Sequence, residues 1–279
     1  MYPELITLDL PVIGRLTITS FGVMMALAFL VAYQVARSEF GRMGKDPELA
    51  GDLLLGALIG GILGAKLYYV LLNWDLTVRD PLGMLFSRAG LVWYGGFLGG
   101  AAGVILMIRR RGERIAPLAD GIAPGLALAY AVGRVGCFLV GDDYGRPTDS
   151  WVGIAFPEGA PPSTAGNLRE AFGVSIPASV PDSEVLAVHP TQLYEVGMSL
   201  LIFFVLWRLR GGRPVGWLFS LWLVLAGFER FIVEFFRAKD DRFFGPLTLA
   251  QVISIGLVAF GLWLMNRSAS RTGGATAAA

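Results

Sequence analysis

The chain has 279 residues, of which 54% are hydrophobic and 16% are charged, whereas an average soluble domain carries about 25% charged residues. The net charge is +1 and the arginines stand in short clusters between apolar blocks, so the sequence excludes nucleic acid as a partner. One cysteine and one histidine exclude an internal disulfide and a zinc site of ordinary ligand number, and no metal is expected.

Long apolar blocks dominate the chain. A hydrocarbon core about 30 Å thick needs about 20 apolar residues in each helix that crosses it. The sequence therefore predicts an all-α integral membrane protein, with one membrane domain over residues 1–279. Seven transmembrane helices are expected, near residues 20–36, 49–72, 91–108, 117–140, 191–207, 215–236 and 246–265.

The segment before the first span alternates apolar and polar side chains and has no basic region ahead of an apolar core. It predicts a short amphipathic lead-in and not a cleavable signal peptide. The second and third spans are rich in glycine, as in "LIGGILGAK" (58–66) and "WYGGFLGG" (93–100). Small residues three and four apart let helices approach closely, so tight helix packing is the expected role of these glycines.

Lysine and arginine gather in four short segments, at 37–45, 109–114, 208–213 and 267–271. With seven spans all four lie on one side of the membrane, which the basic bias of short loops makes cytoplasmic. The N-terminus is then expected outside and the C-terminus in the cytoplasm. The polar, proline-rich segment 141–190 also falls outside. A connection of this length is usually functional, so a small external head, strand-like in places, is expected there.

Ionisable groups inside the predicted spans are costly and therefore mark candidate functional sites. Lys66 lies in the second span, where it either snorkels to the interface or contacts a lipid headgroup. Arg134 lies in the fourth span and Glu195 at the start of the fifth. Glu229 faces away from the other charges of the sixth span and receives no role.

The sixth span carries a second group of charges. Arg230, Glu234 and Arg237 are spaced i, i+4 and i+7, which predicts that they share one face of a helix. One interpretation is a self-compensated ladder of ion pairs that locks helices together. The other is an anion site, because guanidinium groups bind phosphate through paired donors and lipid headgroups supply phosphate. Arg134 is expected to join such a site from a second helix.

The stretch "HPTQLYE" (189–195) stands at a junction between the polar segment and the fifth span. Thr191 or His189 is expected to cap the helix, which explains part of its polarity. Gln192 and Glu195 are three residues apart and therefore face one way. They are expected to brace arginines of other helices.

Four stretches together resemble a known family: "WYGG" (93–96), "GRVGCFLVGDDYGRPTD" (133–149), "HPTQLYE" (189–195) and "RFIVEFFR" (230–237). They are similar, in this order, to motifs of prolipoprotein diacylglyceryl transferases, and the resemblance runs from the first span to the last. It implies an enzyme of the bacterial cytoplasmic (inner) membrane with a periplasmic head. It also implies that no metal or organic cofactor takes part.

The resemblance implies the first step of lipoprotein maturation. The diacylglyceryl group of phosphatidylglycerol moves to the thiol of the lipobox cysteine in the signal peptide of a preprolipoprotein. The products are a thioether and glycerol 1-phosphate. Such a reaction needs a base for the thiol and cations for the leaving phosphate.

The resemblance also implies the site residues. Those with catalytic roles are Arg134, Arg230, Glu234 and Tyr94. Those expected at the headgroup are Arg134, Arg230, Arg237, Gln192, Glu195, Gly145, Asp142 and His189. Of the adjacent acidic residues, Asp142 is expected to matter more than Asp143. The thiol base is open among Tyr94, His189 and Glu234, with the further alternative that no base is needed.

The chain departs from many family members at four positions, where they carry asparagine, glutamate, histidine and tyrosine: Cys137, Asp142, Tyr94 and Phe21, in that order. Tyr94 is the departure of most consequence, because histidine exchanges protons near neutral pH and tyrosine needs strong activation to do so. Cys137 is expected to be a small, half-buried neighbour of the site. Two alternatives stay open: a diverged, non-catalytic paralogue, and a lipid-binding or transport protein, although the sequence has no internal repeat typical of transporters.

Overall fold

The computed structural model describes residues 2–10, 14–87, 92–238 and 242–276. Within these ranges the chain is mainly helical, and its strands pair into two-stranded antiparallel sheets. The chain divides into two compact units. Unit 1 comprises Met1–Ala32 and Ala123–Ala279, and unit 2 comprises Tyr33–Ile122. Helices α1 (Ser20–Arg42) and α6 (Ile115–Val140) contribute residues to both units.

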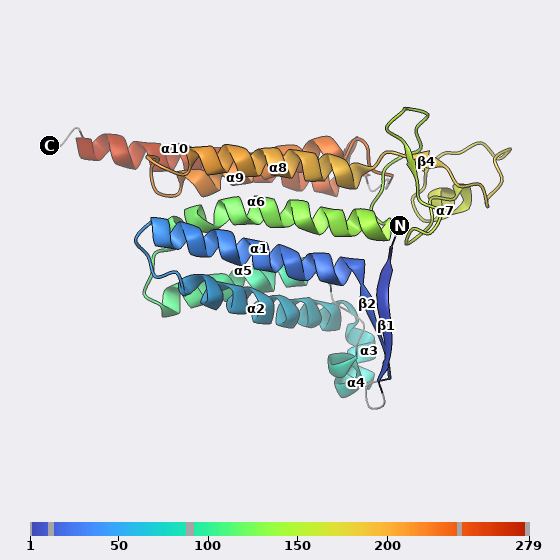
Figure 1. Cartoon of the computed structure of the whole chain (residues 1–279), viewed down its shortest axis with the longest axis horizontal. Coiled ribbons are helices and arrows are strands. Elements are labelled where there is room, and N and C mark those ends of the chain that lie inside the picture. Colours follow the sequence, from blue (N-terminus) through green and yellow to red (C-terminus); the bar gives the residue numbers. More distant parts are fainter. Residues whose placement is uncertain (1, 11–13, 88–91, 239–241, 277–279) are drawn as a thin grey trace. The chain divides into compact units, whose positions relative to one another are not determined.

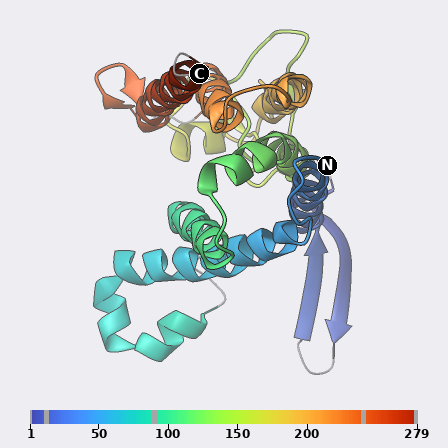
Figure 2. The same cartoon turned by 90° about the vertical axis from the view of Figure 1, so that its left-hand side faces the viewer.

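Unit 1 is a set of long helices that run alongside one another (Figure 1). Besides its parts of α1 and α6, it contains α8 (Thr191–Leu209), α9 (Trp217–Val233) and α10 (Leu249–Thr276). Apolar side chains of α6, α8 and α9 form one core cluster of Ala123, Ala127, Ile202, Leu206 and Leu218. Helix α10 lies beside α9, as Figures 1 and 2 show from two directions.

The segment ahead of α1 forms a hairpin of β1 (Glu4–Leu10) and β2 (Gly14–Thr19). The strands are antiparallel, with Thr7 opposite Thr17. Alternating apolar and polar side chains suit the two-residue period of a strand, so the expected amphipathic lead-in takes the form of a hairpin.

The polar segment 141–190 lies beyond the ends of α6 and α8 within unit 1 (Figure 1). It contains the helix α7 (Ala165–Glu170) and the sheet of β3 (Ile154–Ala155) with β4 (Ala187–Val188). A second core cluster holds it together, made of Tyr144, Phe156, Leu168, Val188 and Ala238. Because Ala238 follows α9, this core ties the segment to the end of that helix. The sheet of β5 (Arg242–Phe244) with β6 (Leu247–Thr248) then leads into α10.

Unit 2 is built on α2 (Leu49–Leu72) and α5 (Trp93–Arg110), with the short helices α3 (Trp74–Arg79) and α4 (Pro81–Phe86) between them. Glycines face one another where α2 and α5 cross: a Cβ atom added at Gly60 or Gly64 would meet the backbone of Gly99, and one added at Gly103 would meet that of Gly56. The expected tight packing of the glycine-rich helices is confirmed.

Replacing Gly99 with alanine is expected to lower the free energy of unfolding by about 1–3 kcal/mol, because the methyl group overlaps a helix backbone that has no room to move. The added Cβ would meet the carbonyl oxygen of Gly60 and lie 2.8 Å from the Cα atom of Gly64. Thermal unfolding in detergent measures the effect. Gly197→Ala on α8 is the matched control: no described atom lies within 4 Å of its added Cβ, and alanine favours helix. Equal midpoints for Gly99→Ala and the unchanged protein contradict the prediction.

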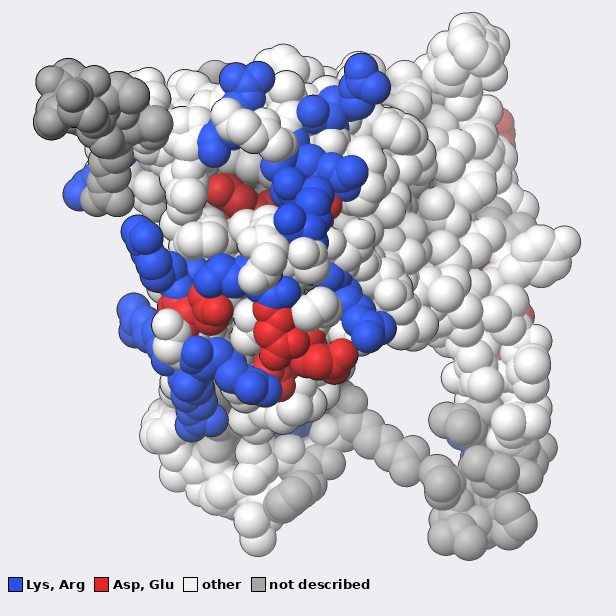
Figure 3. Space-filling model, turned by 60° about the vertical axis from the view of Figure 1, so that its left-hand side comes forward, with Lys and Arg blue, Asp and Glu red and all other residues white. Residues whose placement is uncertain are grey.

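Charged side chains of unit 2 gather where α1 leads into α2 and where α5 leads into α6. The ion pairs there are Arg37–Glu48, Arg42–Glu39, Lys45–Glu113 and Arg111–Asp52. Figure 3 shows basic and acidic side chains beside one another over helix ends, next to a largely uncharged surface. Since Lys45 and Glu113 join the two connections, the basic segments 37–45 and 109–114 lie at the same end of unit 2.

Among the described residues, five helices are long and apolar enough to cross a membrane: α1, α2, α6, α8 and Leu249–Ala269 of α10. Helix α2 exposes Ile59, Ile62, Leu63 and Leu67, a continuous apolar surface of a kind rare on proteins in water. These helices indicate a multi-pass membrane protein. Helices α5 and α9, with 18 and 17 residues, lie outside that group of five, and the number of seven spans stays a prediction.

Candidate active site

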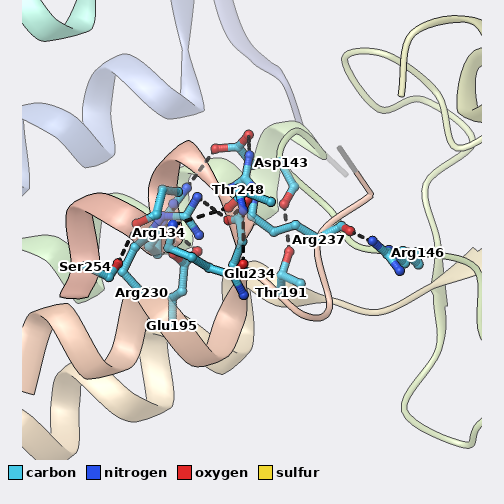
Figure 4. Close-up of polar contacts among 12 residues, drawn as sticks. Arg134, Asp143, Arg146, Thr191, Glu195, Arg230, Glu234, Arg237, Thr248 and Ser254 are labelled. Carbon is cyan, nitrogen blue, oxygen red and sulfur yellow. Dashed lines mark hydrogen bonds and ion pairs between the residues drawn. The ribbon is translucent and has the colours of Figure 1, made fainter. Parts of the chain in front are cut away.

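A continuous network of ion pairs lies at one end of the unit 1 helices (Figure 4). Three arginines and three carboxylates form it, and we call it the arginine–carboxylate network: Arg134, Asp143, Glu195, Arg230, Glu234 and Arg237. All but Asp143 are expected site residues. The ion pairs join α6, the start of α8 and the end of α9, so the network also links these elements.

Arg134 and Glu195 form the most deeply buried pair of the network. The Nε atom of Arg134 lies 2.8 Å from Oε2 of Glu195, and its Nη2 donates to Oε1 at 2.9 Å. The hydroxyl of Tyr130, one turn earlier on α6, donates to the same Oε1 at 2.7 Å. Glu195 is fully buried, and a buried carboxylate is tolerated only when it is paired and hydrogen-bonded. Its expected role of bracing an arginine from another helix is confirmed.

Asp143 joins two arginines from different elements. Its Oδ2 lies 2.9 Å from Nη1 of Arg134 and its Oδ1 lies 2.7 Å from Nη2 of Arg237. The chain turns sharply after α6, with Asp143 in the left-handed region at a φ of 55°, and the hydroxyl of Thr191 donates to its backbone oxygen at 2.7 Å. Burial raises the pKa of Asp143, but Arg237 and Arg134 outweigh it and lower the pKa to about 2. Asp143 is therefore ionised at neutral pH.

Arg230, Glu234 and Arg237 do not share one face of a continuous helix, and that prediction is wrong. Helix α9 ends at Val233, and Glu234 caps it. Nη2 of Arg230 lies 2.5 Å from Oε2 of Glu234, whereas Nε of Arg237 lies 4.0 Å from the same oxygen. The Nη1 atom of Arg230 is buried and has no hydrogen-bond partner among the described atoms. A buried donor without a partner is costly, so it marks a position where a ligand oxygen is favourable.

Arg237 lies beyond the end of α9, and backbone pairing holds it at the network. Gly145 and Arg237 form an isolated antiparallel bridge, and the N–H of Arg146 donates to the carbonyl of Phe236 at 2.8 Å. Gly145 is tightly enclosed: an added Cβ atom would meet the carbonyl oxygen of Phe236 and lie 2.8 Å from Cβ of His189. Gly145 thus permits the close approach that fixes Arg237.

Asp142 takes no part in the ion pairs described above, which Asp143 makes instead. Its Oδ1 is buried without a hydrogen-bond partner among the described atoms, and burial raises its pKa. Asp143 and not Asp142 therefore belongs to the network, and the greater functional weight expected of Asp142 stays a prediction. Gln192, expected to brace an arginine, instead donates from Nε2 to the backbone oxygen of Asp142.

Cys137 is buried on α6, with Nη1 of Arg134 3.5 Å from its sulfur. Cys137, Asp142 and Asp143 lie close enough to share a metal ion. Arg134 donates to the sulfur of Cys137 and to the carboxylate of Asp143. A fixed positive charge at this point disfavours a bound cation, so we assign no metal to these residues.

His189 lies next to Gly145 and packs against aromatic rings. Its Nδ1 lies 3.0 Å from the hydroxyl of Tyr194, and its ring meets that of Phe236 edge to face at 5.3 Å. Burial lowers the pKa of His189, so its ring is neutral at pH 7. Helix α8 begins at Thr191 without a side-chain cap bond, and the capping expected of Thr191 or His189 is wrong.

Tyr94 belongs to unit 2, whereas the arginine–carboxylate network belongs to unit 1. It lies on the first turn of α5, half exposed, with its ring edge to face against that of Trp93 at 5.2 Å. Also in unit 2, Lys66 is buried and donates to the backbone oxygen and the hydroxyl of Ser87 at 2.9 and 2.8 Å. In unit 1, a Cβ atom added at Gly136 would lie 3.5 Å from the ring of Phe21.

Sequence reasoning missed Tyr130, and it did not anticipate the ion pairs of Asp143 or the hydrogen bond from Thr191 to the backbone of Asp143. Tyr130 was detectable, since it stands four residues before Arg134 and therefore on the same helix face. Glu229, which had no role, accepts a hydrogen bond from Ser199 at 2.6 Å and joins α9 to α8.

Comparison with known proteins identifies the family of this chain. A family model described as prolipoprotein diacylglyceryl transferase matches residues 10–267. Phosphatidylglycerol–prolipoprotein diacylglyceryl transferase of Clostridium tetani is 31% identical over 252 residues, covering 90% of this chain and 93% of the relative. Proteins with the same name from Vibrio vulnificus and Nostoc are 32% and 31% identical, each over 91% of this chain and 88% of the relative. The chain therefore belongs to the prolipoprotein diacylglyceryl transferase family.

Proposed function

We propose that this chain transfers the diacylglyceryl group of phosphatidylglycerol to the lipobox cysteine of a preprolipoprotein. The relatives' names supply both substrates, phosphatidylglycerol and prolipoprotein. The thiolate sulfur forms a bond to a glycerol carbon of the lipid, and the bond between that carbon and the phosphate oxygen breaks. The phosphate leaves with the electron pair as glycerol 1-phosphate, and the thiol proton passes to a base or to solvent.

The arginine–carboxylate network is the observation that carries this function. Charge builds up on the leaving phosphate, and donors fixed in advance at that point lower the barrier. Arg134, Arg230 and Arg237 would hold the phosphate, with the unpartnered Nη1 of Arg230 donating to one of its oxygens. Glu234 contacts both Arg230 and Arg237 and would orient them. The three arginines and Glu234 would then act as one anion site rather than as a locking ladder.

The remaining expected site residues would support this anion site. Glu195 anchors Arg134, and Gly145 allows the approach of Arg237. Gln192, Asp142 and His189 would position the turn after α6, because Gln192 donates to the backbone of Asp142 and the carbonyl of His189 accepts from Gly145.

Among the expected thiol bases, Glu234 is the least suited. Its carboxylate already contacts two arginines of the network, Arg230 and Arg237. His189 is neutral at pH 7, so its ring can accept a proton. Tyr94 would require activation by a neighbouring cation to do so. His189 and Tyr94 therefore stay as alternative bases, beside direct loss of the proton to solvent.

The proposed topology follows the basic segments. Seven spans, with α5 and α9 added to the five long apolar helices, put residues 37–45, 109–114, 208–213 and 267–271 in the cytoplasm. The N-terminus and the head formed by 141–190 would then face the periplasm, and the C-terminus the cytoplasm. The membrane would be the bacterial cytoplasmic (inner) membrane, where preprolipoproteins emerge with their signal peptides.

Rescue of a bacterial strain depleted of its own transferase tests the function. We expect growth to be restored, and we expect the purified protein to attach diacylglyceryl to a lipobox peptide in phosphatidylglycerol micelles. A peptide with serine in place of the lipobox cysteine is the control and should stay unmodified. A folded, membrane-inserted protein that neither rescues nor modifies the peptide contradicts the proposal and favours the non-catalytic or transport alternative.

A further inference from the structure

The carboxylates of the arginine–carboxylate network differ in their exposure. The side chains of Glu195 and Glu234 are 0% and 2% exposed, whereas that of Asp143 is 41% exposed. The guanidinium groups that Asp143 contacts, on Arg134 and Arg237, belong to side chains only 13% and 14% exposed. Asp143 is therefore the exposed carboxylate of the network, and it contacts two arginines that are largely enclosed.

Asp143 also decides the net charge of the network. The six side chains of the network carry three positive and three negative charges, so the network is neutral with Asp143 in place. A neutral network offers no net attraction to an anion. Without the carboxylate of Asp143 the other five side chains carry one positive charge, which matches the single negative charge of a phosphodiester.

We propose that Asp143 is an internal counter-ion that occupies the phosphate position, and that the phosphodiester of phosphatidylglycerol displaces it from Arg134 and Arg237. This role rests on the proposed function and adds a specificity-determining residue to it. A ligand without a negative charge gains too little from the arginines to displace the carboxylate, so Asp143 favours lipids that carry a phosphate charge. When the phosphate leaves as glycerol 1-phosphate, the return of Asp143 competes with rebinding of the product.

The backbone around Asp143 suits such an exchange. Thr191 holds the backbone oxygen of Asp143 and not its carboxylate, so the turn can stay in place while the side chain rotates. The permanent partners of the arginines remain: Glu195 keeps Arg134, and Glu234 stays beside Arg237. Displacement of Asp143 therefore exposes donors that are still correctly oriented.

Asp143→Asn tests the exchange, because asparagine keeps the shape and removes the charge. We expect the KM for phosphatidylglycerol to fall about tenfold, and the inhibition constant of free glycerol 1-phosphate to fall by a similar factor. Asp143→Glu retains the charge, and its KM is expected not to fall. Asp149→Asn removes an exposed carboxylate from the same segment, outside the network, and is expected to leave the KM unchanged.

The outcomes separate this inference from the proposed function. An inactive but folded wild-type protein contradicts the function itself. An active wild type whose Asp143→Asn variant has an unchanged or higher KM overturns the exchange and leaves Asp143 a structural residue. Lower inhibition constants for glycerol 1-phosphate without a lower KM also overturn it, since they place the free product and not the lipid at this position. If Asp143→Asn does not fold, Asp143→Ser is measured against the same two expectations.

Discussion

The Arg230→Ala variant is expected to lose about 10²–10³-fold in kcat/KM for diacylglyceryl transfer, the effect of removing one donor aligned with a developing anion. Nη1 of Arg230 is a buried donor with no partner among the described atoms, so it can donate to a ligand oxygen. The variant is also expected to lose some stability, because Arg230 is the close ion-pair partner of Glu234, whose side chain is 2% exposed.

The Arg230→Lys variant separates the charge of Arg230 from its paired donors. Lysine keeps the positive charge but lacks the planar pair of donors, so it cannot both hold Glu234 and donate to a phosphate oxygen. We expect it to recover less than a tenth of the activity lost in Arg230→Ala. Arg208→Ala, which removes an exposed arginine at the end of α8, is the control and should be fully active. Full activity of Arg230→Ala in a purified, folded protein contradicts the assignment of Arg230 to the leaving phosphate.

The charges inside apolar stretches were predictable from the sequence, and the partners of those charges were not. Arg134, Glu195 and Arg230 stand out because a charge in a membrane span is costly. The link between Asp143 and Arg237 joins residues 94 positions apart. It depends on a left-handed turn at Asp143 and on a backbone bridge between Gly145 and Arg237, and neither leaves a periodic signal in the sequence.

Residue spacing alone gave a wrong prediction for the end of the sixth span. Arg230, Glu234 and Arg237 have the spacing of one helix face, but α9 stops at Val233. The backbone after Glu234 pairs with the segment that follows α6: the N–H of Arg146 donates to the carbonyl of Phe236. The helix therefore stops where a tertiary contact begins, and the spacing of residues along one helix cannot predict such a contact. The glycine contacts of α2 and α5 were predictable because each helix carries its own repeat of small residues.

The Arg134→Ala variant is expected to abolish transfer and also to destabilise the protein. Arg134 is the ion-pair partner of Glu195, which is fully buried. Removing one partner of a buried pair leaves an uncompensated charge, at a cost of about 3–5 kcal/mol. Thermal unfolding in detergent and peptide lipidation, measured on the same sample, record the two effects together.

A double variant separates the structural role of Arg134 from its role toward the phosphate. Glu195→Gln in the Arg134→Ala background removes the stranded charge, and its amide can still accept the hydrogen bond of Tyr130. We expect it to regain most of the lost thermal stability and none of the activity, because the donors toward the phosphate are still missing. Recovery of activity together with stability would mean that Arg134 only supports Glu195. In that case Arg230 and Arg237 would bind the phosphate. Displacement of Asp143 would then break only its ion pair with Arg237.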